Sequence, residues 1–351
     1  MSAVLRPSSI SCCPSSRSPA RASVRGHPRI ETKFLMPEPD ISDALTPTVT
    51  LPKQVRGNVR VFHGPHGRGL QTTTAVAKGE LLIGIPKKWA IDVSASQSGG
   101  TAGQIALCCE LAKLRRQNDF RVKHLPESCD MPAFWSEAQL QWLAGSYAHE
   151  PASSQRKTLE SLHANMKPPC SLDEFIWGMC MVQSRTFGGD GVMVFLPFID
   201  LLNSSFEPTL DFDVRRADGY INIHASRDFE KGEEALVSYH GRRAPGLYTE
   251  FLAYGYVPQE GVEYPQLFPW NDTTPEPALQ GLLERWTKHM QAVSGKGLPV
   301  AEDIESNAAA QGGGGSDAAR LSVARNILQH EKRMAVEQAV AIKKRLAAMK
   351  K

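Results

Sequence analysis

The chain lacks several features that would assign it to a class at once. None of its apolar runs approaches the ~18 residues that a membrane-spanning helix needs. Its seven cysteines include no CxxC pair, and their spacing suits neither a zinc site nor a disulfide framework. The formal net charge is only +3, so there is no strong basic footprint. We therefore expect no metal site, no membrane and no nucleic acid among the partners.

Acidic residues are missing from residues 1–30, which hold five arginines and eight serines. An arginine- and serine-rich, acid-free leader is typical of an organellar transit peptide, and it lacks the apolar core of a secretory signal. We predict a transit peptide over residues 1–33 and a proline-rich linker over 34–55. The plastid stroma is the expected location, the mitochondrion is the alternative, and a plain disordered tail is the other reading.

The pattern along the rest of the chain changes twice. Residues 58–62 alternate as a strand does, and residues 81–85 form a short apolar run before Pro86. A helical period follows over about 98–183, and short strands return after Phe187, with a hairpin expected at Asp218-Gly219. The sequence predicts an α+β fold in which a β domain, 56–260, is split by a helical insert.

The region 261–351 has a character of its own. A glycine-rich linker is predicted at about 311–316, and a long helix over 317–351 carries one apolar face. That face either packs on the rest of the protein or docks a partner, and the sequence does not decide between them.

Three polar clusters lie in apolar or aromatic surroundings between residues 184 and 257. Polar side chains beside buried surface are costly unless each finds a partner, so a ligand site explains them best. The guanidinium of Arg185 suits a carboxylate, although a salt bridge to a nearby acid is the commoner fate of an arginine. Asp200 and Asn203 lie three apart, which predicts one side of a helical turn, with capping of that turn as the alternative.

The residues carrying these clusters resemble the SET-domain lysine methyltransferases of the Rubisco large-subunit methyltransferase type. The similar stretches are Ser-Arg-x-Phe187, Leu196 to Ser204, Val237-Ser-Tyr-His-Gly241 and Tyr254-Gly-Tyr-Val257, with a matching stretch from Pro132 to Leu140 in the insert. The resemblance implies a SET-domain fold followed by a helical region that helps to bind a protein substrate.

It also implies S-adenosylmethionine as cofactor and lysine N-methylation as the reaction. The implied cofactor-binding residues are Gly67, Arg68, Gly69, Arg185, Asp200, Asn203, Ser204, Tyr239 and Tyr256. Ser184, Asp200, Tyr239 and Tyr254 would form the substrate-lysine channel, and Tyr239 would be catalytic. Gly67 to Gly69 are expected in a turn-rich loop after a strand. Rubisco large subunit and aldolase are substrates implied by resemblance alone.

Two positions depart from the family pattern. Ser204 stands where the family has histidine after the asparagine, and His240 separates Tyr239 from Gly241. These departures keep a non-catalytic SET-scaffold binding module open as an alternative. Methylation of histidine in place of lysine is a further alternative that these residues do not distinguish.

Overall fold

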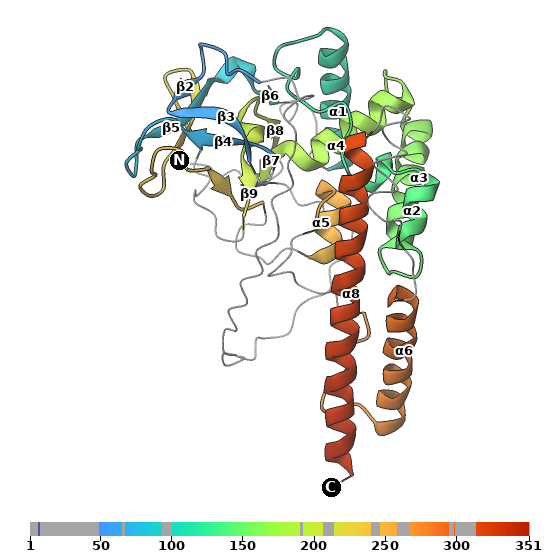
Figure 1. Ribbon diagram of the computed structural model, residues 1–351. Helices are drawn as coiled ribbons and strands as arrows, with labels where there is room; N and C mark the ends of the chain where they lie inside the picture. Colours follow the sequence, from blue (N-terminus) through green and yellow to red (C-terminus); the bar gives the residue numbers. More distant parts are fainter. Residues whose placement is uncertain are drawn as a thin grey trace.

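The structure is a computed structural model that describes residues 6–7, 49–64, 67–92, 100–189, 192–205, 214–239, 246–257, 267–294, 298 and 314–350. Small sheets lie on one side of the molecule and helices on the other, as expected for an α+β fold (Figure 1). The strands are β1 (Arg6–Pro7), β2 (Arg56–Gly57), β3 (Val59–Gly64), β4 (Gly67–Thr72), β5 (Leu81–Pro86), β6 (Ile91–Asp92), β7 (Thr186–Gly189), β8 (Val192–Phe195), β9 (Asn203–Ser204), β10 (Val214–Ala217), β11 (Tyr220–His224) and β12 (Leu236–Val237).

The strands form four small sheets. One has the order β10-β11-β5-β2 and another β1-β7-β8-β6, while β3–β4 is a hairpin and β9–β12 a parallel pair. The predicted hairpin joins β10 to β11, where Asp218 has φ 52° and Gly219 has φ 75°. Positive φ at both positions is what a two-residue hairpin turn requires.

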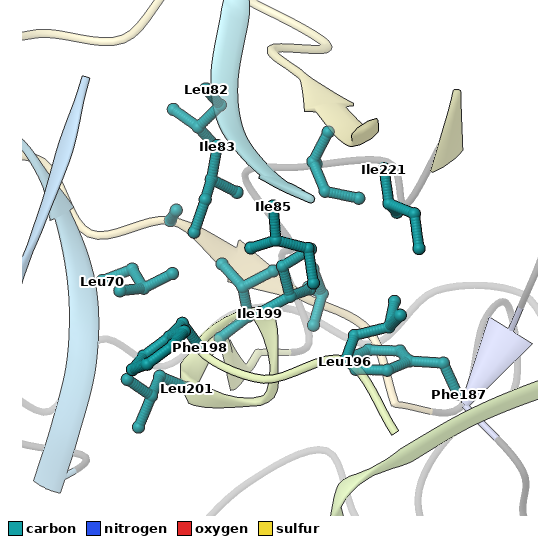
Figure 2. Close-up of a cluster of buried hydrophobic side chains, with 14 of the residues drawn as sticks. Leu70, Leu82, Ile83, Ile85, Phe187, Leu196, Phe198, Ile199, Leu201 and Ile221 are labelled. Carbon is teal, nitrogen blue, oxygen red and sulfur yellow. The ribbon is translucent and has the colours of Figure 1, made fainter. Parts of the chain in front are cut away.

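The first core lies between the sheets and the segment that precedes the site. Figure 2 shows Ile83 and Ile85 of β5 facing Leu196 and Ile199, and all four are fully buried. Burying such a side chain contributes roughly 1.5–3 kcal/mol, so this core fixes the segment on which Asp200 lies. That segment enters the short 3₁₀ helix η4 (Ile199–Leu201).

Helices fill the predicted insert between β6 and β7. They are α1 (Thr101–Arg116), α2 (Glu137–Leu140), α3 (His149–Met166) and α4 (Leu172–Arg185). A serine followed three residues later by a glutamate predicts a capping box, and Ser171 and Glu174 form one reciprocally at the start of α4. α1 packs on α4 around a second core that includes Trp177 and Phe175. α3 lies within the predicted helical insert, and Ala152 is its one fully buried residue.

The C-terminal region contains α5 (Leu247–Tyr254), α6 (Glu276–Ser294) and α8 (Gly314–Met349). α8 runs past α5 and then along α6, and Figure 1 shows the pair extending away from the sheets. The predicted apolar face of α8 is buried: Val323 and Ile327 pack with Phe251 of α5, and Ile342 packs with Trp286 of α6. α6 lies within the region after residue 260 that the resemblance implied to be helical, and its interior contains Gly281.

At the C-terminal end, the start of α8 differs from the prediction, and other predicted boundaries are not tested. α8 begins at Gly314, so Gly314 to Ser316 are helical and not part of a linker. The α8 helix continues through them because helical hydrogen bonds from the next turn offset the low helix propensity of glycine. The rest of the predicted glycine-rich linker, the transit peptide apart from β1, and residues 34–48 lie outside the described residues. The division into domains stays a prediction.

Candidate cofactor and substrate pocket

A pocket of about 540 Å³ opens where β4, η4, the insert and the end of α5 meet. It collects residues that are far apart in the sequence. Its walls are Arg68, Pro126, Ser128, Cys129, Asp130, Ser184, Arg185, Asp200, Leu201, Asn203, Ser204, Tyr239, Tyr254, Gly255 and Tyr256. Every predicted site residue except Gly67 and Gly69 is therefore brought to one cavity.

A buried carboxylate forms the floor of this pocket. The side chain of Asp200 is fully buried, its Oδ1 lies 2.7 Å from Nε2 of His124, and its Oδ2 lies 3.1 Å from Nη1 of Arg185. Burial by itself would raise the pKa of Asp200, but the charges and hydrogen bonds of His124 and Arg185 lower that pKa below its ordinary value. Asp200 therefore presents a negative charge at neutral pH.

Two guanidinium groups border the same cavity. Arg185 ends α4 and bonds both the side chain and the backbone carbonyl of Asp200, so it makes the salt bridge that the sequence held open as an alternative. Its Nε is buried and has no hydrogen-bond partner among the described residues. Burial, and then the charge of Arg185, lower the pKa of Arg68, so the two cations lie close enough to repel one another. An anion between them would relieve that repulsion.

Asn203 does not lie on a helical turn with Asp200, and that prediction was wrong. η4 ends at Leu201, and the next residues form β9, paired in parallel with β12. Strand pairing outweighs the local turn here because β12 supplies backbone partners. Nδ2 of Asn203 donates to Glu234 Oε1 at 2.9 Å and to the carbonyl of Arg68 at 3.3 Å. The Oγ of Ser204 accepts the backbone N–H of Tyr239 at 3.2 Å.

Gly67, Arg68 and Gly69 begin strand β4 and do not form a loop, which corrects a second expectation. They pair with Gly64, His63 and Phe62 of β3. Gly67 has φ +83°, and a Cβ there would meet nothing within 4 Å. A Cβ on Gly69 would lie 2.4 Å from Glu234 Oε1 and 2.8 Å from Asn203 Nδ2. Gly69 therefore supports the pocket from behind Asn203 and does not line it.

Three tyrosines form an aromatic wall. The ring centroid of Tyr254 lies 5.0 Å from that of Tyr239 and 6.1 Å from that of Tyr256. The hydroxyl of Tyr239 donates to the carbonyl of Leu202 at 2.8 Å. Burial raises the pKa of Tyr239 to about 12, so the phenol is neutral at physiological pH. Burial also raises the pKa of Tyr256, and the charge of the buried Glu250 raises it further.

Sequence reasoning missed the part of the wall that comes from the insert. His124 is buried against Phe198 and reaches Asp200, while Pro126, Ser128, Cys129 and Asp130 line the cavity itself. Gly255, the left-handed C-cap of α5, contacts the backbone of Asp130 and Met131. The one available signal was a histidine directly before Leu125-Pro126. His240 lies outside the described residues.

Within the described part of the chain, no group of three or more His, Cys, Asp or Glu side chains is placed to hold a metal ion. The helices of that part also include none with the length and hydropathy to cross a membrane.

Comparison with known proteins places this pocket in a family. Residues 67–240, which include most of the pocket, match the family model of the SET domain. The chain contains a SET domain. This match and the arrangement of helices and small sheets confirm the predicted α+β SET fold. Its solved neighbours include the SET domain of LSMT bound to lysine and AdoHcy, with a TM-score of 0.61 at 17% identity, covering 82% of this chain and 87% of that one.

Two curated relatives are chloroplast enzymes. The SET-domain chain is 25% identical over 172 residues to the ribulose-1,5 bisphosphate carboxylase/oxygenase large subunit N-methyltransferase of Nicotiana tabacum, covering 42% of this chain and 35% of that protein. It is 27% identical over 165 residues to the fructose-bisphosphate aldolase-lysine N-methyltransferase of Arabidopsis thaliana, covering 40% of this chain and 34% of that protein. The chain thus spans about a third of the length of these relatives.

Proposed function

We propose that this SET-domain chain is an S-adenosylmethionine-dependent protein-lysine N-methyltransferase. The observation that carries the proposal is the convergence of Arg185, Asp200, Asn203, Tyr239 and Tyr254 on one pocket from separate elements. A relative named as a lysine N-methyltransferase and a neighbour bound to lysine and AdoHcy support the same reading.

The residues fit the charges of the proposed cofactor. Its carboxylate suits the guanidinium groups of Arg68 and Arg185, which both line the pocket. Its cationic groups suit the ionised Asp200. Asn203 offers an amide at the same wall, held by Glu234. When bound, S-adenosylmethionine supplies an activated methyl group on a sulfonium.

The three tyrosines fit the substrate side of the reaction. Transfer of a methyl group to an amine is an in-line displacement, so alignment supplies much of the rate. Tyr239 is held by the Leu202 carbonyl and is neutral, so it can orient the amine but does not serve as its base. Burial of a lysine beside Tyr239 and Tyr254 lowers the pKa of its amine, and the aromatic faces also tolerate the cation.

We further propose a plastid protein as the substrate. The relatives that methylate Rubisco large subunit and aldolase are chloroplastic, and residues 1–33 have the composition of a transit peptide. Removal of that leader would take away β1, a two-residue strand on the edge of β7. Import of a fusion of residues 1–33 to a fluorescent protein tests the location, with mitochondrial import as the contrary result.

The activity is tested with tritiated S-adenosylmethionine and stromal extract. Wild type is expected to label a protein band, and Tyr239→Phe to label it about a hundredfold more slowly, as for loss of an active-site hydrogen-bonding group. Tyr220→Phe is the matched control, because Tyr220 packs beneath Arg56 outside the pocket. Equal labelling by wild type and Tyr239→Phe would remove Tyr239 from this role.

Two further measurements separate the alternatives. Mass spectrometry of the labelled protein distinguishes methyl-lysine from methyl-histidine. Calorimetry with S-adenosylmethionine and the purified protein distinguishes an enzyme from a scaffold: absence of binding at high micromolar concentration would favour a non-catalytic binding module.

A further inference from the structure

His124 is a buried histidine of the insert that contacts the SET-domain floor. Its Nε2 lies 2.7 Å from Oδ1 of Asp200, and the two side chains are 2% and 0% exposed. The residues are 76 positions apart in the chain. This contact therefore joins the insert to the pocket, and both of its side chains are shielded from solvent.

The two carboxylate oxygens of Asp200 have different side-chain partners. Oδ1 is bonded by His124, and Oδ2 is bonded by Arg185. A buried carboxylate stays ionised only when such partners offset its desolvation, and removal of one partner leaves an uncompensated oxygen. Arg185 alone cannot replace His124, because its Nη1 is engaged on the opposite oxygen and on the Asp200 carbonyl.

Two aromatic rings pack against the imidazole of His124. It stacks on Phe198 with centroids 4.8 Å apart and on Phe195 at 6.2 Å. Its Nδ1 is buried and has no hydrogen-bond partner among the described residues. The ring therefore makes its one polar contact with Asp200, which indicates a dedicated role for that contact.

The position of His124 in the chain extends this role to the pocket wall. Pro126, Ser128, Cys129 and Asp130 follow it directly and line the cavity. The bond to Asp200 consequently fixes the start of the segment that closes the pocket on the insert side.

We infer that His124 is a positioning residue of the cofactor pocket: it keeps the Asp200 carboxylate ionised and fixed opposite Arg185, and it anchors the wall that begins at Pro126. The inference rests on the proposed function in one respect: it takes S-adenosylmethionine to be the ligand that the charge of Asp200 attracts.

The groups that act electrostatically on or with Asp200 come from four elements. They are His124 of the insert, Arg185 of α4, Arg68 of β4 and the neutral Tyr239 after β12. Loss of His124 removes one hydrogen bond and one favourable charge from this set. Asp200 then takes up a proton at higher pH, and the negative charge offered to the cationic cofactor disappears within an accessible pH range.

The experiment measures S-adenosylmethionine affinity by calorimetry from pH 5 to pH 8.5. Wild type is expected to show nearly constant affinity on the acid side. His124→Leu should lose about tenfold between pH 8 and pH 5, as for a buried carboxyl whose pKa rises about two units above the ~3.9 of an unperturbed aspartate. His124→Gln keeps a donor but not the charge. Its loss of affinity between pH 8 and pH 5 should therefore be larger than that of wild type and smaller than that of His124→Leu. His289→Gln is the control, because it removes a buried histidine contact to Glu331 outside the pocket.

The outcomes are distinguishable. Absence of binding by wild type overturns the proposed function. If wild type binds S-adenosylmethionine, and His124→Leu and His124→Gln show the same pH profile of affinity as wild type, the inference is overturned and the proposed function stands. A uniform loss at every pH, matched by His289→Gln, would show a merely structural role and also overturns it. Should His124→Leu not fold, ¹³C NMR titration of the Asp200 carboxyl in wild type and His124→Gln gives the same decision without any ligand.

Discussion

The hydroxyl of Tyr248 in α5 donates a 2.7 Å hydrogen bond to the carboxylate of Glu331 in α8. The same oxygen accepts from Ser146 Oγ at 2.7 Å and from the backbone N–H of Tyr147 at 3.1 Å, while the other lies 3.1 Å from His289 Nε2. One fully buried carboxylate therefore joins the insert, α5, α6 and α8. Because α5 ends at Tyr254, this junction ties the C-terminal helices to the aromatic wall of the pocket.

Glu331→Ala should lower the free energy of unfolding by about 3–5 kcal/mol, because it removes the common acceptor of several buried donors. Tyr248→Phe removes one hydrogen bond to a charged group and should cost about 1.5–3 kcal/mol. Urea unfolding of both variants measures the difference. Val340→Ala, at an exposed position of the same helix, is the control and should change little. Equal stability of Glu331→Ala and Val340→Ala would contradict the assignment.

Gly69→Ala and Gly67→Ala form a matched pair in β4. The new Cβ at position 69 overlaps the side-chain atoms of Asn203 and Glu234, so it should displace Asn203 and weaken cofactor affinity about tenfold, or ~1.4 kcal/mol. The Cβ at position 67 meets nothing within 4 Å, and its positive φ should cost about 1 kcal/mol of stability with little effect on affinity. Calorimetry measures the cofactor affinity of both variants, and thermal unfolding measures their stability. Equal cofactor affinities of Gly69→Ala and Gly67→Ala would contradict the prediction.

The neutral phenol of Tyr239 sets an expectation for the pH dependence of methyl transfer. Because burial raises its pKa to about 12, Tyr239 does not ionise between pH 7 and pH 10. The pH–rate profiles of wild type and Tyr239→Phe should therefore have the same shape over that range and differ in height. A wild-type step near pH ~10, the ordinary value for tyrosine, that Tyr239→Phe lacks would show a tyrosinate in the mechanism.

Local sequence signals predicted local structure well in this chain. The Asp218-Gly219 turn and the Ser171–Glu174 capping box depend on neighbouring residues, and both are present. Family motifs also indicated most of the pocket. The contact of His124 with Asp200 could not be predicted in this way, because it joins residues 76 positions apart and depends on how the insert folds back. Asn203 was misplaced for a related reason: its strand exists through pairing with the distant β12.

Asp200→Asn tests the electrostatics of the pocket floor through the pH dependence of stability. The pKa of Asp200 is lower in the folded protein than the ~3.9 of an unperturbed aspartate, so its ionised form contributes stability above that value. That contribution is lost as pH falls through the lower, folded pKa. At pH 7 the asparagine leaves Arg185 and His124 without their buried anion and should cost about 3–5 kcal/mol. The difference in unfolding free energy between Asp200→Asn and wild type should then narrow as the pH falls from about 5 toward 2, because Asp200 of the wild type becomes protonated in that range. Urea unfolding of both proteins across this range measures the narrowing; a difference that stays constant with pH would mean that Asp200 stabilises the fold by packing and not by its charge.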